Sequence, residues 1–131
     1  MTATAMLIFH IDRDSVCAGD DTDPHEATVA VPASVSLLDL IAAAQQVCPL
    51  ARIAGGQATW LIDIGRPARC VGVIAQQWPG PRLVIAGDTA AVGVVDGVYS
   101  LYFHYWGQSD PQAVLAALRS GQPLPSRAAA S

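Results

Sequence analysis

The side chains of this 131-residue chain that could act as a base, a nucleophile or a metal ligand include three histidines and three cysteines. They are His10, His25, His104, Cys17, Cys48 and Cys70. A cysteine and a histidine that are distant in sequence can meet in a fold and form a nucleophilic pair. The usual catalytic patterns are absent, because the chain has no GxSxG, HExxH or GxGxxG and no lysine to complete a Walker phosphate loop. We therefore expect no catalytic residue and no cofactor, while a small enzyme or ligand-binding domain using His and Cys stays as an alternative.

The same residues have simpler interpretations. The cysteines are odd in number, far apart and without a CxxC spacing, which is typical of reduced thiols in a cytoplasmic protein. His10 falls inside an apolar, strand-like run, so we expect it to belong to the core or the sheet and not to act as a base.

The negative charge of the chain is concentrated in the fifteen residues from Asp12 to Glu26, DRDSVCAGDDTDPHE. This acidic segment holds six of the eleven acidic residues and a single Arg13, a charge of −5 against −4 for the whole chain. Three interpretations are open. The segment is a solvated hairpin tip, since Asp and Gly tolerate turn geometry; or it holds a metal ion; or it is a surface for Arg and Lys side chains of another protein.

Spacing argues against the metal ion. Pro24 interrupts the loop, and no Gly stands where a calcium loop of the EF-hand type turns sharply. Tetrahedral zinc would require more His or Cys ligands than one. We therefore expect no metal. For the surface interpretation the partner-binding residues are Asp20, Asp21, Asp23, His25 and Glu26.

Five of the eight aromatic residues lie between Tyr99 and Trp106, in the stretch YSLYFHYW. Alternate side chains of a strand face opposite sides, which divides this stretch into two sets. The set expected in the core is Tyr99, Leu101, Phe103 and Tyr105. The other set is Ser100, Tyr102, His104 and Trp106. If the second set is exposed, Tyr102 and Trp106 are further partner-binding residues, because Tyr and Trp dominate interface hot spots; alternatively, the last helix covers it.

Hydrophobic periodicity and turn residues predict an α+β protein with a mixed or mainly antiparallel sheet and one main helix packed across it. A hairpin comes first, from strands over 6–17 and 27–31 that the acidic loop connects. The main helix over 36–48 follows. The remaining strands are predicted over 58–64, 70–76, 82–86, 91–95 and 98–106, the first three as a meander. A short helix over 111–120 ends the order ββαβββββα.

The two helices have clear end signals. Ser36 and Asp39 are spaced as a capping box, and Pro49 stops the first helix. Asp110 is positioned to cap the second helix, which Gly121 ends.

Composition predicts a single domain over 1–121 and a loose C-terminal tail over 122–131. With 52% hydrophobic and 14% charged residues, the chain is not of the disordered class. Its apolar runs are too short to span a bilayer, and its start lacks the basic segment of a secretory signal. We therefore expect a cytoplasmic protein without a membrane partner. A net-acidic chain without lysine is also a poor candidate for nucleic acid, which needs a basic face.

The order of elements resembles the β-grasp arrangement of ubiquitin-like domains. A hairpin enters a helix at Ser36, and further strands follow. The resemblance covers about residues 5–88 and leaves the final hairpin and helix as additions. It implies one helix across a curved mixed sheet, although an α+β sandwich of another topology would give the same pattern.

In overall character the chain is similar to the immunity proteins of bacterial polymorphic-toxin and contact-dependent growth-inhibition systems. The stretches that carry this similarity are VCAGDDTDPHEATVAVPASVSLLDLI, IAGGQATWLI and GVIAQQWPGPRLV. The resemblance implies a protein that binds one cognate toxin and whose acids occupy the cationic cleft where a nuclease toxin holds phosphates. It assigns no role to any single residue. A β-grasp adaptor or structural subunit, using a sheet edge or the aromatic strand, is the other binding alternative.

Overall fold

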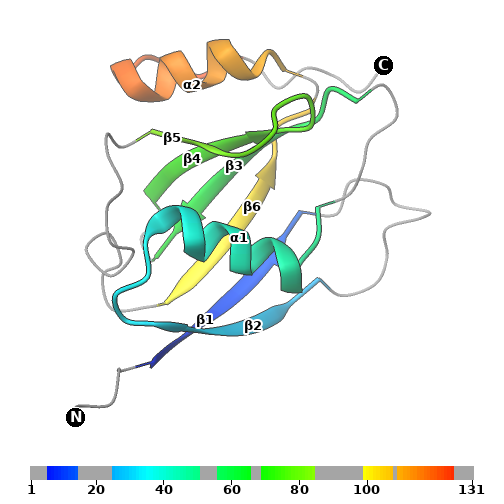
Figure 1. Cartoon of the computed structure of the whole chain (residues 1–131). Coiled ribbons are helices and arrows are strands. Elements are labelled where there is room, and N and C mark those ends of the chain that lie inside the picture. The colour runs from blue at the N-terminus through cyan, green and yellow to red at the C-terminus, as the bar shows by residue number, and fades with distance from the viewer. Residues whose placement is uncertain are drawn as a thin grey trace.

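The computed structural model describes residues 6–14, 25–50, 56–65, 69–84, 99–107 and 109–125. In these ranges the chain forms six strands and two helices (Figure 1). In chain order they are β1 (Met6–Arg13), β2 (Ala27–Pro32), α1 (Leu37–Val47), β3 (Thr59–Ile64), β4 (Arg69–Ala75), β5 (Arg82–Leu83), β6 (Ser100–Tyr105) and α2 (Pro111–Ser120). The strand predicted over 91–95 lies outside the described residues.

The strands form one mixed sheet in the order β2-β1-β6-β3-β4-β5. The β1–β2 hairpin and the β3-β4-β5 meander are antiparallel, as predicted, and β6 is antiparallel to β3. The pair β1–β6 is parallel. The predicted α+β class, with a helix packed on a mixed sheet, is confirmed.

The last strand occupies a different place from the one expected. The sequence order suggested that β6 is an addition beyond the β-grasp-like part, whereas β6 lies in the middle of the sheet, between β1 and β3. Its core-facing residues Leu101 and Phe103 are fully buried, which a strand paired on both sides allows. Of the described elements, only α2 follows β6 in sequence.

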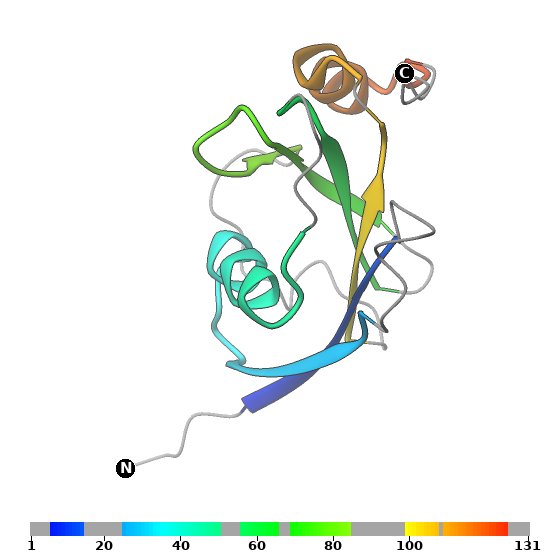
Figure 2. The same ribbon diagram turned by 90° about the vertical axis from the view of Figure 1, so that its right-hand side faces the viewer.

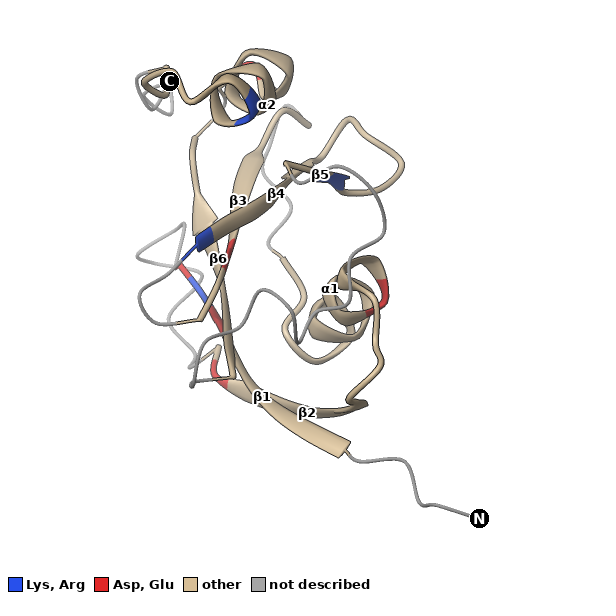
Figure 3. Cartoon of the chain, turned by 90° about the vertical axis from the view of Figure 1, so that its left-hand side faces the viewer, with Lys and Arg blue, Asp and Glu red and all other residues tan. Residues whose placement is uncertain are grey.

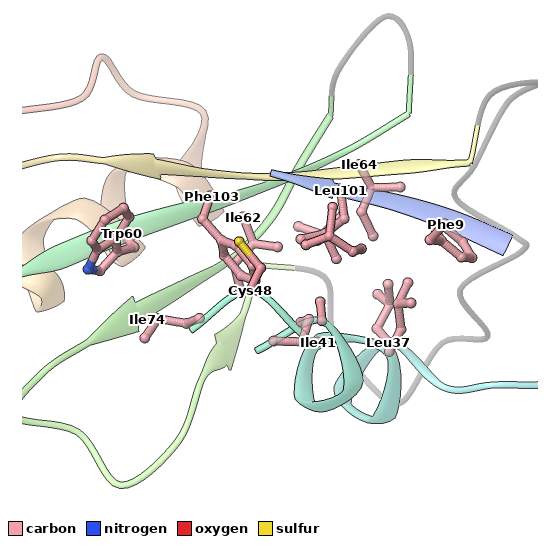
Figure 4. Packing of buried hydrophobic residues seen from close by; sticks show 14 of the residues in the cluster. Phe9, Leu37, Ile41, Cys48, Trp60, Ile62, Ile64, Ile74, Leu101 and Phe103 are labelled. Carbon is pink, nitrogen blue, oxygen red and sulfur yellow. The ribbon is translucent and has the colours of Figure 1, made fainter. Parts of the chain in front are cut away.

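Helix α1 lies across one face of the sheet (Figure 2). Its start is fixed as predicted, because the Ser36 hydroxyl accepts a hydrogen bond of 3.1 Å from the backbone N–H of Asp39. The apolar side of α1, including Leu37 and Ile41, packs against the core-facing side chains of β1, β3, β4 and β6 (Figure 4). These include Phe9, Trp60, Ile62, Ile74, Leu101 and Phe103.

Helix α2 builds a smaller second cluster. The Asp110 carboxylate accepts from the backbone N–H of Gln112 at 3.1 Å, and Gly121 closes the helix with a φ of 70°, where an L residue would be strained. Val114 and Leu115 of α2 are buried together with Leu61 of β3 and Val73 of β4. None of the helices in the described residues is both long and apolar enough to cross a membrane.

Candidate functional site

The two faces of the sheet differ in what covers them. Helix α1 covers the core face, while α2 packs on the opposite face, here called the outer face, through Leu61 and Val73 of β3 and β4. The strands β1 and β6 place polar side chains on the outer face. Neither described helix packs against these side chains in the two hydrophobic clusters. The parallel register of β1 and β6 places Asp12 beside Tyr102 on this face. The part of the outer face formed by β1 and β6 therefore carries a group of polar and ionisable side chains.

His104 lies between two carboxylates from neighbouring elements. Its Nε2 is 2.9 Å from Asp63 Oδ2, and its Nδ1 is 3.6 Å from Asp14 Oδ2. Asp63 reaches it from β3, because the β3–β6 register puts Leu61 opposite His104 and the next outward residue of β3 is Asp63. The His104 side chain is 40% exposed, so the imidazole is oriented by carboxylates at the surface of the sheet.

Asp14 does more than approach His104. Its Oδ1 accepts a hydrogen bond of 2.7 Å from the Tyr102 hydroxyl, and its Oδ2 accepts one of 2.9 Å from the backbone N–H of Tyr105. Burial of the phenol and the adjacent Asp14 carboxylate raise the pKa of Tyr102. The hydroxyl thus stays a donor, and the carboxylate ties the end of β1 to β6.

Asp63 connects His104 to Cys70. Burial raises the pKa of Asp63 above its ordinary value, and the charge of His104 and a hydrogen bond from Cys70 partly counter this effect. Burial, and next the Asp63 charge, raise the pKa of Cys70 to about 11. The thiol is therefore protonated at neutral pH, and a carboxylate lies between it and the imidazole. This arrangement is the opposite of an activated Cys–His pair, in which the histidine stabilises a thiolate.

Beside this network the outer face contains a pocket of about 550 Å³. Its polar side chains come from β1, the start of β2, β3 and β6. They are His10, Asp12, Glu26, Asp63, Ser100, Tyr102 and His104. Figure 3 marks the acidic positions in red where β1, β3 and β6 run side by side.

The described residues that line this outer-face pocket carry more acidic than basic side chains. Three carboxylates line it, and no arginine is among the described residues that do so. Arg13, the basic residue of the acidic segment, belongs to the other face of β1, where its Nε donates to the backbone oxygen of Pro49 at 3.0 Å. Carboxylates together with the face of the Tyr102 ring suit a cationic ligand.

A second cavity, of about 250 Å³, has a different character. It lies between the end of α1 and the turn that joins β4 to β5, and it is lined by Trp60, Trp78 and the prolines of that turn, with two glutamines. None of the described residues that line it is charged or can act as a nucleophile. It offers apolar volume but no reactive group.

The predicted partner-binding residues are distributed over several places. Asp20, Asp21 and Asp23 lie outside the described residues. His25 is half-buried, and Glu26 is exposed at the rim of the outer-face pocket. Tyr102 is in the same pocket. Trp106 is separate from it, because its indole N–H donates to the backbone oxygen of Pro125 at 3.0 Å and its ring packs against the cluster below α2.

Several residues of the site were not predicted as site residues from the sequence. Asp63 is the main one, and its signal was visible as a lone acid inside the otherwise apolar strand ATWLIDI. Asp12 was counted as charge but not as part of a pocket. His10 was expected in the core or the sheet, and it is an exposed sheet residue on the outer face.

No protein-family model, curated protein or solved structure matches the chain. Within the described residues no group of three or more His, Cys, Asp or Glu side chains is arranged to hold a metal ion. What the site offers chemically is a negatively charged, partly aromatic pocket.

Proposed function

We propose that this protein is a binding module that docks its acidic outer face onto a basic surface of a partner protein, and that it acts as an immunity protein. In that role it neutralises a cognate toxin by occupying the cationic cleft of the toxin's active site. The observation that carries the proposal is the outer-face pocket, which three carboxylates line and in which no described arginine takes part.

The acidic segment supports this proposal because it begins and ends at the pocket. Its first and last residues, Asp12 and Glu26, both line the pocket. The residues between them contribute Asp20, Asp21 and Asp23 to the charge of −5. Charges concentrated in this way attract a basic partner over about 10 Å at 0.1 M salt and orient it before contact.

A small enzyme would use the same pocket. The histidine and cysteine side chains near the pocket distinguish this alternative from a binding module. Both ring nitrogens of His104 lie within ion-pair distance of a carboxylate. Neither Cys48 nor Cys70 lines the pocket, and the pKa of Cys70 is raised to about 11. Since a Cys–His mechanism needs a thiolate beside an available imidazole, the geometry favours binding over this chemistry.

Co-expression with a toxin domain encoded beside this gene tests the proposal. Wild-type protein should protect the cells, and the triple variant Asp20→Asn, Asp21→Asn, Asp23→Asn should fail to do so. The matched control is Asp39→Asn, which removes an exposed acid on α1, beyond the core face, and should protect like the wild type. Full protection by the triple variant would contradict acidic docking. A neighbouring gene for a metabolic enzyme in place of a toxin would contradict the immunity role.

Salt dependence separates acidic docking from the adaptor alternative. The affinity of the complex should fall steeply between about 50 mM and about 500 mM NaCl, because exposed charges are screened over this range. An interface made by the sheet edge or the aromatic strand would keep its affinity. Isothermal titration calorimetry at the two salt concentrations measures the difference.

A further inference from the structure

The outer face of the β1–β2 hairpin carries apolar side chains where a solvated sheet would carry polar ones. Met6 and Ile8 are 55% and 61% exposed, the two most exposed large hydrophobic residues described. The antiparallel register places Pro32 beside Met6 and Ala30 beside Ile8, both also exposed. We name these four residues, Met6, Ile8, Ala30 and Pro32, the apolar strip.

The apolar strip continues directly into the acidic pocket. Alternate residues of β1 face the same side at steps of about 7 Å, so Ile8, His10 and Asp12 follow one another along the outer face. His10 and Asp12 line the pocket. The distance from Ile8 to Asp12 along the strand is thus about 13 Å, the span of four residues in an extended chain. An exposed apolar area with a polar pocket at its end is the usual composition of a protein-interaction surface.

The pocket favours one kind of basic side chain. A guanidinium group is planar, donates in two directions to carboxylates and stacks on aromatic rings, whereas an ammonium group is a strongly hydrated point charge. The pocket offers Asp12 and Glu26 as acceptors, and the ring of Tyr102 as a surface for stacking. Both features match arginine better than lysine.

We propose that the part of the outer face left open by the described helices binds a segment of the basic partner that places one arginine side chain in the pocket and apolar side chains on the apolar strip. An extended segment lying along β1 would present the arginine and an apolar residue four positions apart. Complementary charge selects the partner, and the apolar strip adds contact area that salt does not screen. This inference rests on the proposed function for the basic nature of the partner.

The pocket half of the inference is tested without any partner. Adding N-acetyl-arginine amide to ¹⁵N-labelled protein should shift the backbone amide signals of Tyr102 and His104 in a saturable way. The citrulline analogue, which has the same shape without the charge, should shift neither signal, and the lysine analogue should bind more weakly. The double variant Asp12→Asn, Glu26→Gln should weaken arginine binding about tenfold. Asp39→Asn, on α1, should leave it unchanged.

The apolar half is tested on the complex. Ile8→Thr keeps a β-branched residue in the strand and should lower the affinity for the partner about tenfold, equally at low and high salt. It should leave the binding of N-acetyl-arginine amide unchanged. The matched control is Leu38→Gln, which removes an exposed apolar side chain from α1 and should bind the partner like the wild type.

The outcomes separate this inference from the proposed function. Equal signal shifts with the arginine and citrulline compounds, or none with either, would overturn the arginine site even if the triple acidic variant still fails to protect against the toxin. An unchanged affinity of Ile8→Thr would overturn the role of the apolar strip. Saturable arginine binding together with an absence of toxin protection would contradict the immunity function and leave the arginine site standing.

Discussion

Asp14 and Asp63 each lie near one ring nitrogen of His104, and each carboxylate also accepts hydrogen bonds from other groups. Asp14 accepts hydrogen bonds from Tyr102 and from the backbone of Tyr105, while Asp63 accepts one from Cys70. At this scale sequence reasoning found the residue types but not the contacts. Asp14 belonged to a run of acids and Asp63 to an apolar strand, and only the pairing of β1 and β3 with β6 brings them to the same imidazole.

Replacing Asp14 should destabilise the fold more than replacing Glu26, a nearby exposed acid that lines the pocket. Asp14→Ala leaves the Tyr102 hydroxyl and the Tyr105 N–H without their acceptor. We expect a loss of about 2 kcal/mol of unfolding free energy, because bonds to a charged acceptor are strong and this side chain is only partly exposed. Tyr102→Phe should lose about 1 kcal/mol. Urea denaturation measures both values, with exposed Glu26→Ala as the control; equal losses for Asp14→Ala and Glu26→Ala would refute the structural role.

Cys70 should react slowly with thiol reagents at neutral pH. Its pKa is raised from 9.0 to about 11, so at pH 8 its thiolate fraction is about a hundredfold lower than that of an unperturbed thiol. Iodoacetamide labelling, followed by mass spectrometry of the Cys70 peptide, should accelerate about tenfold per pH unit from pH 8 and level off near pH 11. The urea-unfolded protein is the reference and should level off near pH 9. Rapid labelling of the folded protein at pH 7 would mean that Asp63 and burial do not suppress the thiolate.

At the scale of elements, local sequence signals predicted the helix ends and the pairing of consecutive strands, but not the pairing of strands distant in sequence. The Ser36 and Asp110 caps and the glycine end at Gly121 are local interactions, and all three are present as predicted. The hairpin and the meander join strands that are consecutive in sequence, and they too were predicted. The position of β6 depends on its contacts with β1, about ninety residues earlier, which no local pattern encodes.

Gly72 in β4 is the element-scale position most sensitive to a small change. A Cβ atom there would lie 3.0 Å from the backbone oxygen of Arg82 in β5 and 3.3 Å from Ile62 Cδ1. Gly72→Ala should therefore push β5 away from β4 and lower the unfolding free energy by about 1–2 kcal/mol. Gly80→Ala is the control, since its Cβ meets nothing within 4 Å and its φ is not positive. Thermal unfolding of the two variants tests this, and equal melting temperatures would show that β5 yields without cost.

At the scale of the whole molecule, one part of the outer face of the sheet is packed against a helix and another part lines a pocket. Over β3 and β4 this face is covered by α2, and there Trp106 is held against the second cluster. Over β1 and β6 it presents the acidic pocket. The sequence left two alternatives for the outward set of the aromatic stretch, exposure or cover by the last helix. The structure divides the set between them, because α2 packs over β3 and β4 and its cluster includes Trp106, directly after β6, while Tyr102 and His104 line the pocket.

The cluster below α2 should behave as a second core. Leu115 is 3% exposed and packs with Leu61, Val73 and Val114. Leu115→Ala should lower the unfolding free energy by about 2–4 kcal/mol, because it removes buried methyl groups and leaves a cavity. Gln112→Ala, at an exposed position of the same helix, should change it by less than about 0.5 kcal/mol. Urea denaturation measures both. A small loss for Leu115→Ala would show that α2 is only loosely attached to the sheet.

The central place of β6 also has a consequence for how the protein is made. The half-sheet β2-β1 and the half-sheet β3-β4-β5 are neighbours of β6 but not of each other. During translation, everything from Met6 to Leu83 is synthesised before the strand that joins the halves. The nascent chain therefore carries two open strand edges, on β1 and β3, until residue 105 emerges. This late closure is the interval in which the open strand edges are most exposed to misassembly.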